Sequence, residues 1–446
     1  MLNNYFFFLG INLIFSNDIK IKPTFFSIYS STGSDWIYQK TPLTYFGAGL
    51  KANFDNDLWN IDLQYTQLGF FGEIKSELYH FSPIKSLPYL DKSKDAPGYW
   101  SEYINARIAY ITNVLEFDFG IFDRHWGYGV RALQVSSKAP SYPQFGLEWK
   151  LNENLILSYF HGFLNSGIED SSRMIYYDND FSHRTINIPR SIASHKIEWS
   201  PTGDFSLSLN ETVIYASRSL DIHYLIPMAP FYPIENYLGD TDNLQMGFDM
   251  SYKLSANKKI YLGFFMDEVT PEWILNEKNH NWFAWQIGIN AKKIRSKDIF
   301  LTAEYNWTDQ RIYKHKYNIN DYYSHNSPLG FWAGPHSEEL LLKFLSLYEK
   351  FRITFEYSYV KRGSMTREMI NSHYNDTYDK RYENGYQKRA FTLLKIDRLT
   401  SIDGLELSFA VNNIKFINSN FILNESDVSI ISIDKLAIEI GVNYNH

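Results

Sequence analysis

The sequence predicts one all-β domain, a transmembrane antiparallel β-barrel of about 18 strands whose lumen is partly filled by inserted loops. Three observations predict this fold. Apolar and polar residues alternate along paired stretches, a tight turn joins the two stretches of each pair, and a long polar or aromatic loop separates one pair from the next. Strands that cross a bilayer have this pattern because one face meets lipid and the other meets the lumen.

The alternation is clearest in two stretches. In residues 244–254 the even-numbered side chains are Leu, Met, Phe or Tyr, whereas the odd-numbered ones are Gln, Gly, Asp, Ser and Lys. In residues 351–359 aromatic and Ile side chains alternate with Arg, Thr, Glu and Ser. A helix has a period of 3.6 residues and would not sort these side chains onto two faces.

The same pattern predicts the strands in chain order, with turns of Asn, Asp, Gly, Pro or short polar residues. A weak first strand near 24–32 precedes eight hairpins, and a final strand covers 435–445. The hairpins pair 44–54 with 58–66, 99–111 with 114–122, 144–151 with 154–163, 193–200 with 204–216, 243–254 with 258–267, 282–293 with 298–307, 336–347 with 350–360, and 390–398 with 404–414.

The connections between hairpins, among them 67–98, 164–192, 308–335 and 361–389, exceed the ~12 to 15 residues that compact soluble domains tolerate. An even strand number with both termini on the side of the short turns is typical of a bacterial outer-membrane barrel. We therefore expect the chain in the bacterial outer membrane, with its long loops facing the cell exterior.

A large soluble β-sandwich or propeller is the structural alternative, because one buried face also produces alternation. The asymmetry of short turns and long loops, and the lack of repeat-length self-similarity, argue against it. In the barrel, Lys253, Arg352 and Glu356 must face the lumen, since a cation facing lipid at mid-depth costs about 2 to 4 kcal/mol.

Residues 1–16 are predicted to be a signal peptide, and residues 17–446 a single barrel domain. The apolar run from Tyr5 to Phe15 has the length of a signal-peptide core, and the small Ser16 suits the last position before cleavage. The stretch contains neither Lys nor Arg, so an apolar first strand is the alternative.

Composition excludes several functional classes. The chain has no cysteine, which excludes disulfides, thiolate nucleophiles and zinc–sulfur sites. Its net charge of −7, without a concentrated basic stripe, argues against nucleic acid as a partner. Aromatic residues make up 17% of the chain, with 34 Tyr and 33 Phe, which suits girdles at two membrane interfaces. We expect no cofactor.

Residues 221–242 form the most unusual predicted loop, with three prolines that argue against a central strand or a regular helix. So much apolar surface should not remain in water, so we expect the loop to pack against the barrel wall or to fold into the lumen as a plug. Sealing one rim is the alternative. Tyr232, Glu235 and Asn236 are its candidate ligand-binding residues.

Residues 123–145 combine aromatic rings, amides and a cation, which together make a carbohydrate platform when rings stack on sugar faces. The candidates are Arg124, His125, Trp126, Tyr128, Gln134 and Tyr142. Packing of the lumen and an interfacial girdle explain the same composition.

In residues 329–340 we add Trp332 and His336 as carbohydrate-binding candidates. A metal site there is disfavoured because His336 and Glu339 would not share a strand face without a bulge.

Loop 361–389 contains seven Lys or Arg and four Asp or Glu, so it could meet anionic glycan or lipopolysaccharide or could simply be solvated.

No catalytic constellation is evident. Ser194 and His195 are adjacent in a predicted strand and would face opposite sides, and there is no nucleophile elbow or phosphate loop.

The chain resembles the Wzi-type capsule assembly family of outer-membrane proteins. The matching stretches are 124–129, 139–146, 228–237 and 334–340. The resemblance implies an eighteen-stranded barrel that attaches or organises capsular or extracellular polysaccharide as a lectin. Enterobacterial members look as if they open with a periplasmic helical segment, which this sequence does not match. No ligand residue is carried over from the family.

The sequence thus predicts a monomeric, non-enzymatic barrel that anchors capsular or extracellular polysaccharide, with outer-membrane lipid and lipopolysaccharide as its surroundings. A substrate-specific porin for sugars or other small nutrients is the main alternative. A lipid-modifying enzyme is a third.

Overall fold

The computed structural model describes residues 19–34, 37–38, 42–72, 81–92, 98–180, 182–218, 220–267, 282–293, 298–374, 380–423, 426–427 and 432–445. The predicted signal peptide, residues 1–16, lies outside the described residues, so it stays a prediction. Among the described residues, no helix is both long enough and apolar enough to cross a membrane.

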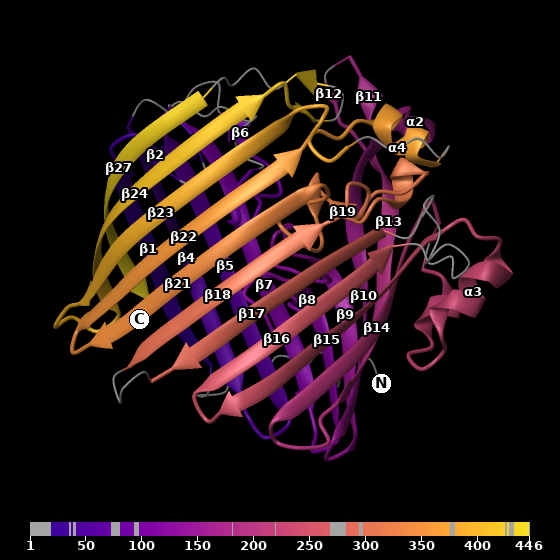
Figure 1. Cartoon of the computed structure of the whole chain (residues 1–446), viewed down its shortest axis with the longest axis horizontal. Helices are drawn as coiled ribbons and strands as arrows, with labels where there is room; N and C mark the ends of the chain where they lie inside the picture. The colour runs from indigo at the N-terminus through magenta and orange to yellow at the C-terminus, as the bar shows by residue number, and fades with distance from the viewer. Residues whose placement is uncertain are drawn as a thin grey trace, which may run out of the picture.

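The chain forms a closed antiparallel β-barrel of eighteen strands, as the sequence predicts (Figure 1). In order around the barrel the strands are β1 (Lys20–Ser30), β4 (Leu43–Asp55), β5 (Trp59–Phe71), β7 (Tyr99–Ile111), β8 (Leu115–Phe122), β9 (Tyr142–Asn152), β10 (Leu155–Glu169), β13 (Asn187–Trp199), β14 (Phe205–Ala216), β15 (Asn243–Ser255), β16 (Lys258–Asp267), β17 (Trp282–Lys292), β18 (Ile299–Thr308), β21 (Ser337–Tyr348), β22 (Phe351–Gly363), β23 (Tyr386–Leu399), β24 (Leu405–Ser419) and β27 (Ser432–Asn445). The first strand pairs with the last, which closes the barrel and leaves no open edge.

Short elements decorate the barrel. They are β2 (Gly33–Ser34), β3 (Ile37–Tyr38), β6 (Asp91–Lys92), α2 (Ser171–Met174), β11 (Asp178–Asn179), β12 (Ser182–His183), η2 (Ile222–Leu225), α3 (Phe231–Leu238), η5 (Asn318–Asn320), β19 (Tyr323–Ser324), β20 (Ser327–Pro328), α4 (Arg367–Tyr374), β25 (Ile422–Leu423) and β26 (Ser426–Asp427). We call the rim with the hairpin turns the turn end and the opposite rim the loop end.

Side chains sort between the two faces of the wall as the alternation predicts. Met250, Tyr252 and Leu254 are exposed on the outer face of β15. Toward the lumen, Asp249 accepts a hydrogen bond from Gln134, and Glu356 lies beside Arg131. Arg352, on the same face of β22 as Glu356, pairs with Asp397 and Glu406.

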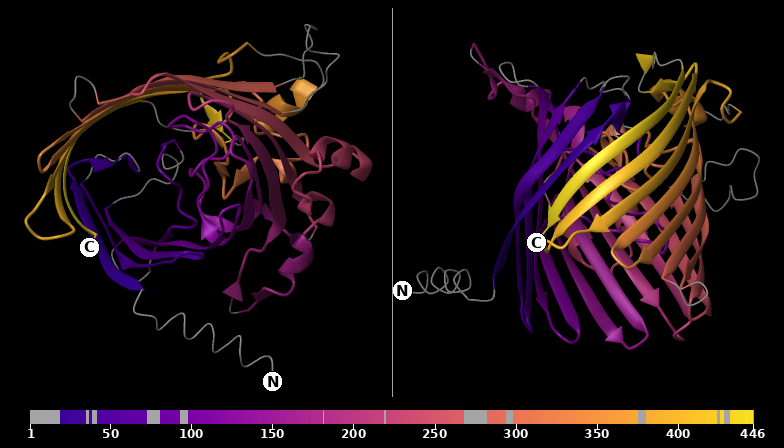
Figure 2. Two further views of the ribbon diagram at one scale, coloured as in Figure 1. Left: turned by 90° about the horizontal axis from the view of Figure 1, so that it is seen from below. Right: turned by 90° about the vertical axis from the view of Figure 1, so that its left-hand side faces the viewer.

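Two insertions take opposite positions relative to the wall (Figure 2). Residues 123–141, between β8 and β9, and residues 309–336, between β18 and β21, lie inside the barrel, and we call them the plug. Residues 220–242, between β14 and β15, lie outside it, and we call them the strap. The strap therefore packs against the wall and does not fill the lumen.

The strap contains a helix, α3, which the three prolines had argued against. Pro233 falls in the first turn of α3, where its missing N–H is not needed, and Pro230 occupies the N-cap position. Gly239 ends the helix in a left-handed conformation with φ of 100°. Proline therefore marks the start of this helix and does not prevent it.

Candidate functional site

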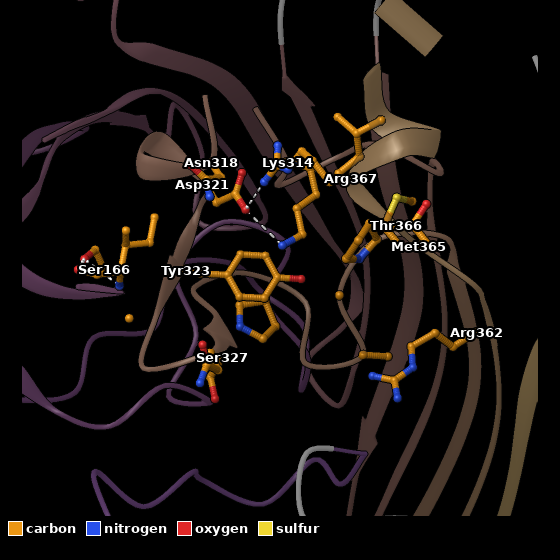
Figure 3. A pocket seen from close by; sticks show the side chains of 18 of the residues that line it. Ser166, Lys314, Asn318, Asp321, Tyr323, Ser327, Arg362, Met365, Thr366 and Arg367 are labelled. Atoms are coloured by element: carbon orange, nitrogen blue, oxygen red, sulfur yellow. Dashed lines mark hydrogen bonds and ion pairs between the residues drawn. The ribbon is translucent and has the colours of Figure 1, made fainter. Parts of the chain in front are cut away.

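A cavity of about 460 Å³ lies at the loop end of the barrel (Figure 3). Three distant parts of the chain line it: the loop ends of β10 and β13, the second plug segment, and the residues from the end of β22 into α4. The wall strands fix the first and third parts, while the plug supplies the side opposite them. The cavity is therefore built on the rigid sheet and not on a single loop.

The lining has a strong positive excess. Among the described residues that line it are four cations, Arg190, Lys314, Arg362 and Arg367, and one carboxylate, that of Asp321, which gives this part of the lining a formal charge of +3 on a chain whose net charge is −7. A concave site with low-dielectric walls focuses such a potential. The cavity therefore favours a negatively charged ligand.

Asp321 partly neutralises two of these cations. Its Oδ2 lies 3.0 Å from Nζ of Lys314 and 3.2 Å from Nη2 of Arg367. The other terminal nitrogen of Arg367, Nη1, donates to the carbonyl of His315 at 2.7 Å. Burial alone would lower the pKa of Lys314, but the facing Asp321 carboxylate more than reverses this and leaves the pKa above its usual value. Lys314 is therefore charged at neutral pH.

Arg190 has a different environment. Its guanidinium donates to the backbone carbonyls of Asn318, Ile319 and Tyr323 at 2.9, 2.5 and 2.8 Å. These three acceptors carry only partial charge, so they orient the side chain without cancelling it. Arg190 thereby ties η5 and β19 to the wall and keeps its positive charge beside the cavity.

The remaining lining suits a hydroxylated ligand. It offers side-chain amides, hydroxyls and two aromatic rings, from Asn318, Asn326, Ser166, Ser327, Thr366, Tyr323 and Trp332. Amides and hydroxyls both donate and accept hydrogen bonds, and ring faces pack against apolar C–H surfaces. The lining as a whole can bind a molecule that carries hydroxyl groups and an anionic group.

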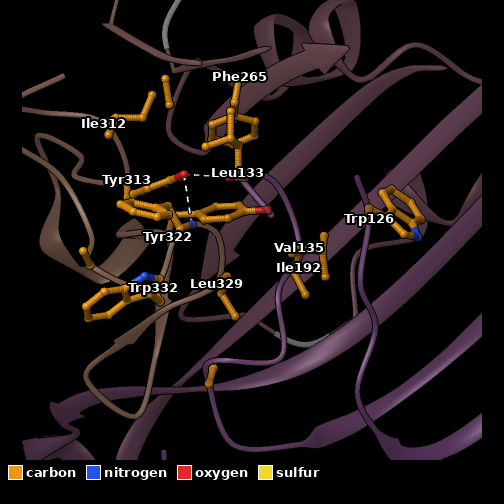
Figure 4. Close-up of a cluster of buried hydrophobic side chains, with 14 of the residues drawn as sticks. Trp126, Leu133, Val135, Ile192, Phe265, Ile312, Tyr313, Tyr322, Leu329 and Trp332 are labelled. Atoms are coloured by element: carbon orange, nitrogen blue, oxygen red, sulfur yellow. Dashed lines mark hydrogen bonds between the residues drawn. The ribbon is translucent and has the colours of Figure 1, made fainter. Parts of the chain in front are cut away.

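The plug is joined to two sides of the barrel wall by a continuous buried cluster (Figure 4). The cluster starts at Ile192 and Ile214 on β13 and β14 and ends at Phe391 and Phe416 on β23 and β24, which lie on opposite sides of the eighteen-stranded ring. Plug residues fill the space between them, among them Leu133, Val135, Ile312, Tyr313, Tyr322, Leu329 and Phe331. Hydrophobic packing therefore spans the bore from wall to wall.

Buried ionic contacts fasten the plug to the wall. Arg131 donates from Nε and an Nη to the two carboxylate oxygens of Glu339, at 3.0 and 2.9 Å. Glu339 also accepts from the indole of Trp332 and the hydroxyl of Ser358. On β18, Glu304 accepts from the backbone N–H of Val130 at 2.7 Å. In Glu339 and in Glu304, both carboxylate oxygens accept hydrogen bonds.

Of the candidates from residues 123–145, four have protein contacts in the lumen. Arg124 bonds to Asp118 and Gln144, and Gln134 donates to Asp249 at 2.8 Å. Trp126 and Tyr142 are members of the buried cluster. These contacts match the alternative of lumen packing, and none of the four lines the cavity.

The other two candidates of this segment also lie away from the cavity lining. His125 is exposed, with Nε2 at 3.1 Å from the carbonyl of Gly129. Tyr128 has the ammonium of Lys259 5.1 Å from its ring centre. A ligand role for them stays a prediction.

The two candidates of residues 329–340 lie close to the cavity. Trp332 lines it directly. His336 is buried behind the rim, stacked on Tyr382 with ring centres 4.9 Å apart, and its Nε2 accepts from the backbone N–H of Tyr382. His336 therefore supports the rim, whereas Trp332 can meet a ligand.

The strap candidates are separated from the cavity by the barrel wall. Tyr232 and Asn236 are exposed on α3 and Glu235 is buried beneath it. The structure thus distributes the eleven candidates among the lumen, the loop-end rim and the outer wall.

Sequence reasoning missed Arg190, Lys314 and Asp321. Arg362 and Arg367 fall in loop 361–389, whose positive excess was the one signal that pointed to this place. Ser194 and His195 point to opposite faces as expected, since Ser194 contacts Thr212 at 2.6 Å and His195 contacts Glu211 at 3.1 Å.

Comparison with known proteins identifies the fold. No protein-family model and no curated protein matches the chain. Among solved structures it is similar to Wzi, an outer-membrane protein involved in group 1 capsule assembly in Escherichia coli and a carbohydrate-binding β-barrel. The two share 15% identity over 98% of this chain and 87% of Wzi, with a TM-score of 0.58.

The chain also has a weaker similarity to two structures with Occ names. OccAB2 of Acinetobacter baumannii has 10% identity over 96% of this chain and 98% of its own, with a TM-score of 0.49. OccD3 (OpdP) of Pseudomonas aeruginosa has 10% identity over 96% and 92%, with a TM-score of 0.48. The similarity to Wzi, at 15% identity, shows the barrel fold alone.

Proposed function

We propose that this outer-membrane barrel binds acidic capsular or extracellular polysaccharide at the loop-end cavity and holds it at the cell surface without catalysis. The observation that carries the proposal is the formal charge of +3 on the described residues that line the cavity, in a barrel whose lumen the plug partly fills. Hydroxyl, amide and aromatic groups in the same lining suit sugar residues, and the cations suit their acidic substituents.

The size and charge of the cavity support this ligand class. About 460 Å³ is within the range of small-molecule sites, so the cavity would take a short stretch of a longer chain. Hydrogen bonds between a cation and a carboxylate contribute about 1.5 to 3 kcal/mol each. Two or three such contacts would select an acidic glycan over a neutral one.

The partly filled lumen supports retention over transport. A substrate-specific porin, the main alternative, needs a continuous aqueous path, and the buried cluster that links opposite walls narrows the space for such a path. Planar-bilayer recording separates the two functions. We expect no stable open channel from the purified protein, and a stable conductance would favour the porin.

The binding test uses two polysaccharides of different charge. Isothermal titration of the detergent-solubilised protein should detect alginate, a polyuronate, and should detect no binding of dextran, which is neutral. Arg367→Gln should weaken alginate binding about tenfold, because it removes one charged contact. Arg398→Gln makes the same charge change on an exposed residue near the turn end and should leave binding unchanged. Equal binding of alginate and dextran would contradict the proposal.

The cellular test measures retention. Deletion of the gene should shift polysaccharide from the cell-bound fraction to the medium while total synthesis stays the same. Unchanged retention would count against the anchoring role even if purified protein binds alginate.

A further inference from the structure

The outer wall of the barrel carries a polar pair where lipid-facing residues are expected. His195 on β13 and Glu211 on β14 are register partners, and Nε2 of His195 lies 3.1 Å from Oε2 of Glu211. On the same outward face, Leu209 is 57% exposed. An ionisable pair inside an apolar face is costly unless something covers it.

The strap covers this pair. Oε2 of Glu211 accepts a hydrogen bond from the backbone N–H of Phe231, the first residue of α3, at 2.6 Å. The ring of His195 lies 4.3 Å from the ring of Phe231, centre to centre. A carboxylate at a helix N-terminus satisfies a free N–H and is stabilised by the helix dipole. The wall therefore supplies the N-terminal cap that α3 lacks in its own sequence, where the capping position is Pro230.

The strap reaches well below the loop-end rim. Glu211 lies five residues from Ala216, the last residue of β14, which is about 16 Å along the strand. Its partner on β15 is Met246, which in turn pairs with Met266 on β16. The start of α3 is therefore level with apolar residues of the lipid-facing wall.

The outer surface of the strap is mostly apolar, and the exposed side chains of His223 and Asn236 are polar exceptions. Its exposed large side chains are Leu220, Ile222, Ile226, Met228, Tyr232 and Tyr237, with Tyr237 82% exposed. Its carboxylates Asp221 and Asp242 pair with Arg218 at the base, and Glu235 is buried. Asp240 is 70% exposed and lies beside Lys316, at the loop end. The carboxylates of the strap are thus paired at its base, buried, or located at the loop end.

An apolar groove of about 470 Å³ continues from the strap onto the bare wall. It begins at His195 and Glu211, which the strap covers. Apolar side chains of four strands line most of the rest, namely Ile197, Leu209, Met246, Phe248, Phe264 and Met266. The groove therefore leads from the pair that the strap covers onto apolar side chains of the lipid-facing strands.

We propose that the strap is embedded in the loop-side leaflet of the membrane, where its outer surface contacts lipid acyl chains and its underside shields the His195–Glu211 pair from them. The occupant of this surface is hydrocarbon, because the surface continues the lipid-facing wall and exposes no carboxylate or ammonium group at the depth of Glu211. This inference is independent of the ligand proposed for the cavity.

The absence of cysteine allows a direct test by spin labelling. A single cysteine introduced by Met228→Cys or Tyr237→Cys carries the only label when the full-length protein is placed in vesicles of dioleoylphosphatidylcholine. Leu209→Cys, on the bare wall, gives the lipid reference, and Tyr176→Cys, in the connection between β10 and β13, gives the water reference. Accessibility to oxygen and to a water-soluble nickel chelate then reports depth.

We expect the labels at both strap positions to fall on the lipid side of the midpoint between the two references. Labels at both positions on the water side would overturn the proposal, as would a split in which Met228 is in water. The label at position 228 decides the outcome of the test because Met228 lies close in sequence to Phe231, the residue in contact with the wall.

A second test examines the shielding. Replacement of residues 222–240 by a short Gly-Ser linker exposes His195 and Glu211 to lipid, and we expect a severalfold lower yield of folded protein in the vesicles. Adding His195→Leu and Glu211→Leu to the same deletion should restore the yield. A deletion that leaves the yield unchanged, or a double replacement that fails to restore it, would contradict the shielding role.

Discussion

The plug and the strap are both aromatic-rich insertions, yet one lies inside the barrel and the other outside. In each, a wall carboxylate accepts a backbone N–H from the insertion: Glu304 from Val130 in the plug, and Glu211 from Phe231 in the strap. Glu304 points into the lumen and Glu211 points outward. Since successive strand residues face opposite sides, a shift of one position would exchange these environments. The contact residue on the wall thus differs between the two insertions in the side to which its side chain points: the lumen for the plug and the outside for the strap.

The two insertions also differ in how they depend on the barrel. The plug is joined to several strands by buried charges and a wall-to-wall cluster, so its loss affects the lumen as a whole. The strap rests on β13, β14 and β15 through a small cluster around Tyr215, Tyr224 and Phe231. We therefore expect mutations in the plug to change conductance through the lumen, and mutations in the strap to change the stability of the strap alone.

The largest effect should come from Glu339→Ala. It leaves the buried Arg131 guanidinium without its bidentate partner, a change that costs about 3 to 5 kcal/mol. The plug should loosen, and single-channel conductance should appear in planar bilayers. Glu406→Ala is the matched control, because its partner Arg352 is 42% exposed and such a pair contributes about 1 kcal/mol or less. Equal conductance in both variants would contradict the role of the plug.

Phe231→Ala should destabilise the strap alone. Phe231 is fully buried against the wall, and removal of such a ring costs about 3 kcal/mol. Hydrogen exchange of the strap amides should rise roughly a hundredfold while the plug amides and the conductance stay unchanged. Tyr237→Ala, at an 82% exposed position, is the control. Increased exchange in the plug would show that the two insertions are coupled.

Tyr313→Phe should have a moderate effect within the plug. The Tyr313 hydroxyl donates to the carbonyl of Leu133 at 2.6 Å and accepts from the N–H of Phe331 at 3.1 Å, so both plug segments lose a buried contact. We expect a loss of about 2 kcal/mol, measured as faster exchange of residues 130–135. Tyr317→Phe, at a 52% exposed ring, should leave that exchange unchanged.

The smallest effect should be a pH dependence of the plug. Burial, with a lesser contribution from Lys316, lowers the pKa of His315 to about 4. In an unfolded plug His315 takes up a proton near pH 6.5, whereas in the folded plug it does so only near pH 4. The free energy of unfolding of the plug therefore falls as the pH drops from 6.5 toward 4. At pH 5.5 the loss is about 1 kcal/mol. His315→Gln should remove this part of the pH dependence in hydrogen exchange, and an unchanged profile would contradict it.

The strands could be predicted because their determinants are local. Alternation and turn residues lie within each hairpin, so all eight hairpins and both terminal strands are confirmed. The positions of the insertions could not be predicted in the same way. Residues 221–242 lie outside and contact Glu211 on the outer face of the wall, and their aromatic composition suits lumen and lipid equally.

The cavity was the hardest feature to predict. Its charges come from positions 190, 314, 321, 362 and 367, which only the closed barrel brings together. Each is an Arg, Lys or Asp, residue types that usually lie at the protein surface and do not stand out in their own segment. Trp332, which lines the cavity, was a candidate because an aromatic ring near Gly and Pro stands out in the sequence, whereas a basic side chain among many does not.

Closure of the ring by β1 and β27 has a consequence for biogenesis. Thr24 pairs with Asn445, so the seam joins nearly the whole length of the polypeptide. Pairings of such large sequence separation form slowly, because the intervening chain must be ordered first. The seam is therefore the last joint to form, and until the C-terminal strand arrives the nascent sheet has two unsatisfied edges that the assembly environment must protect.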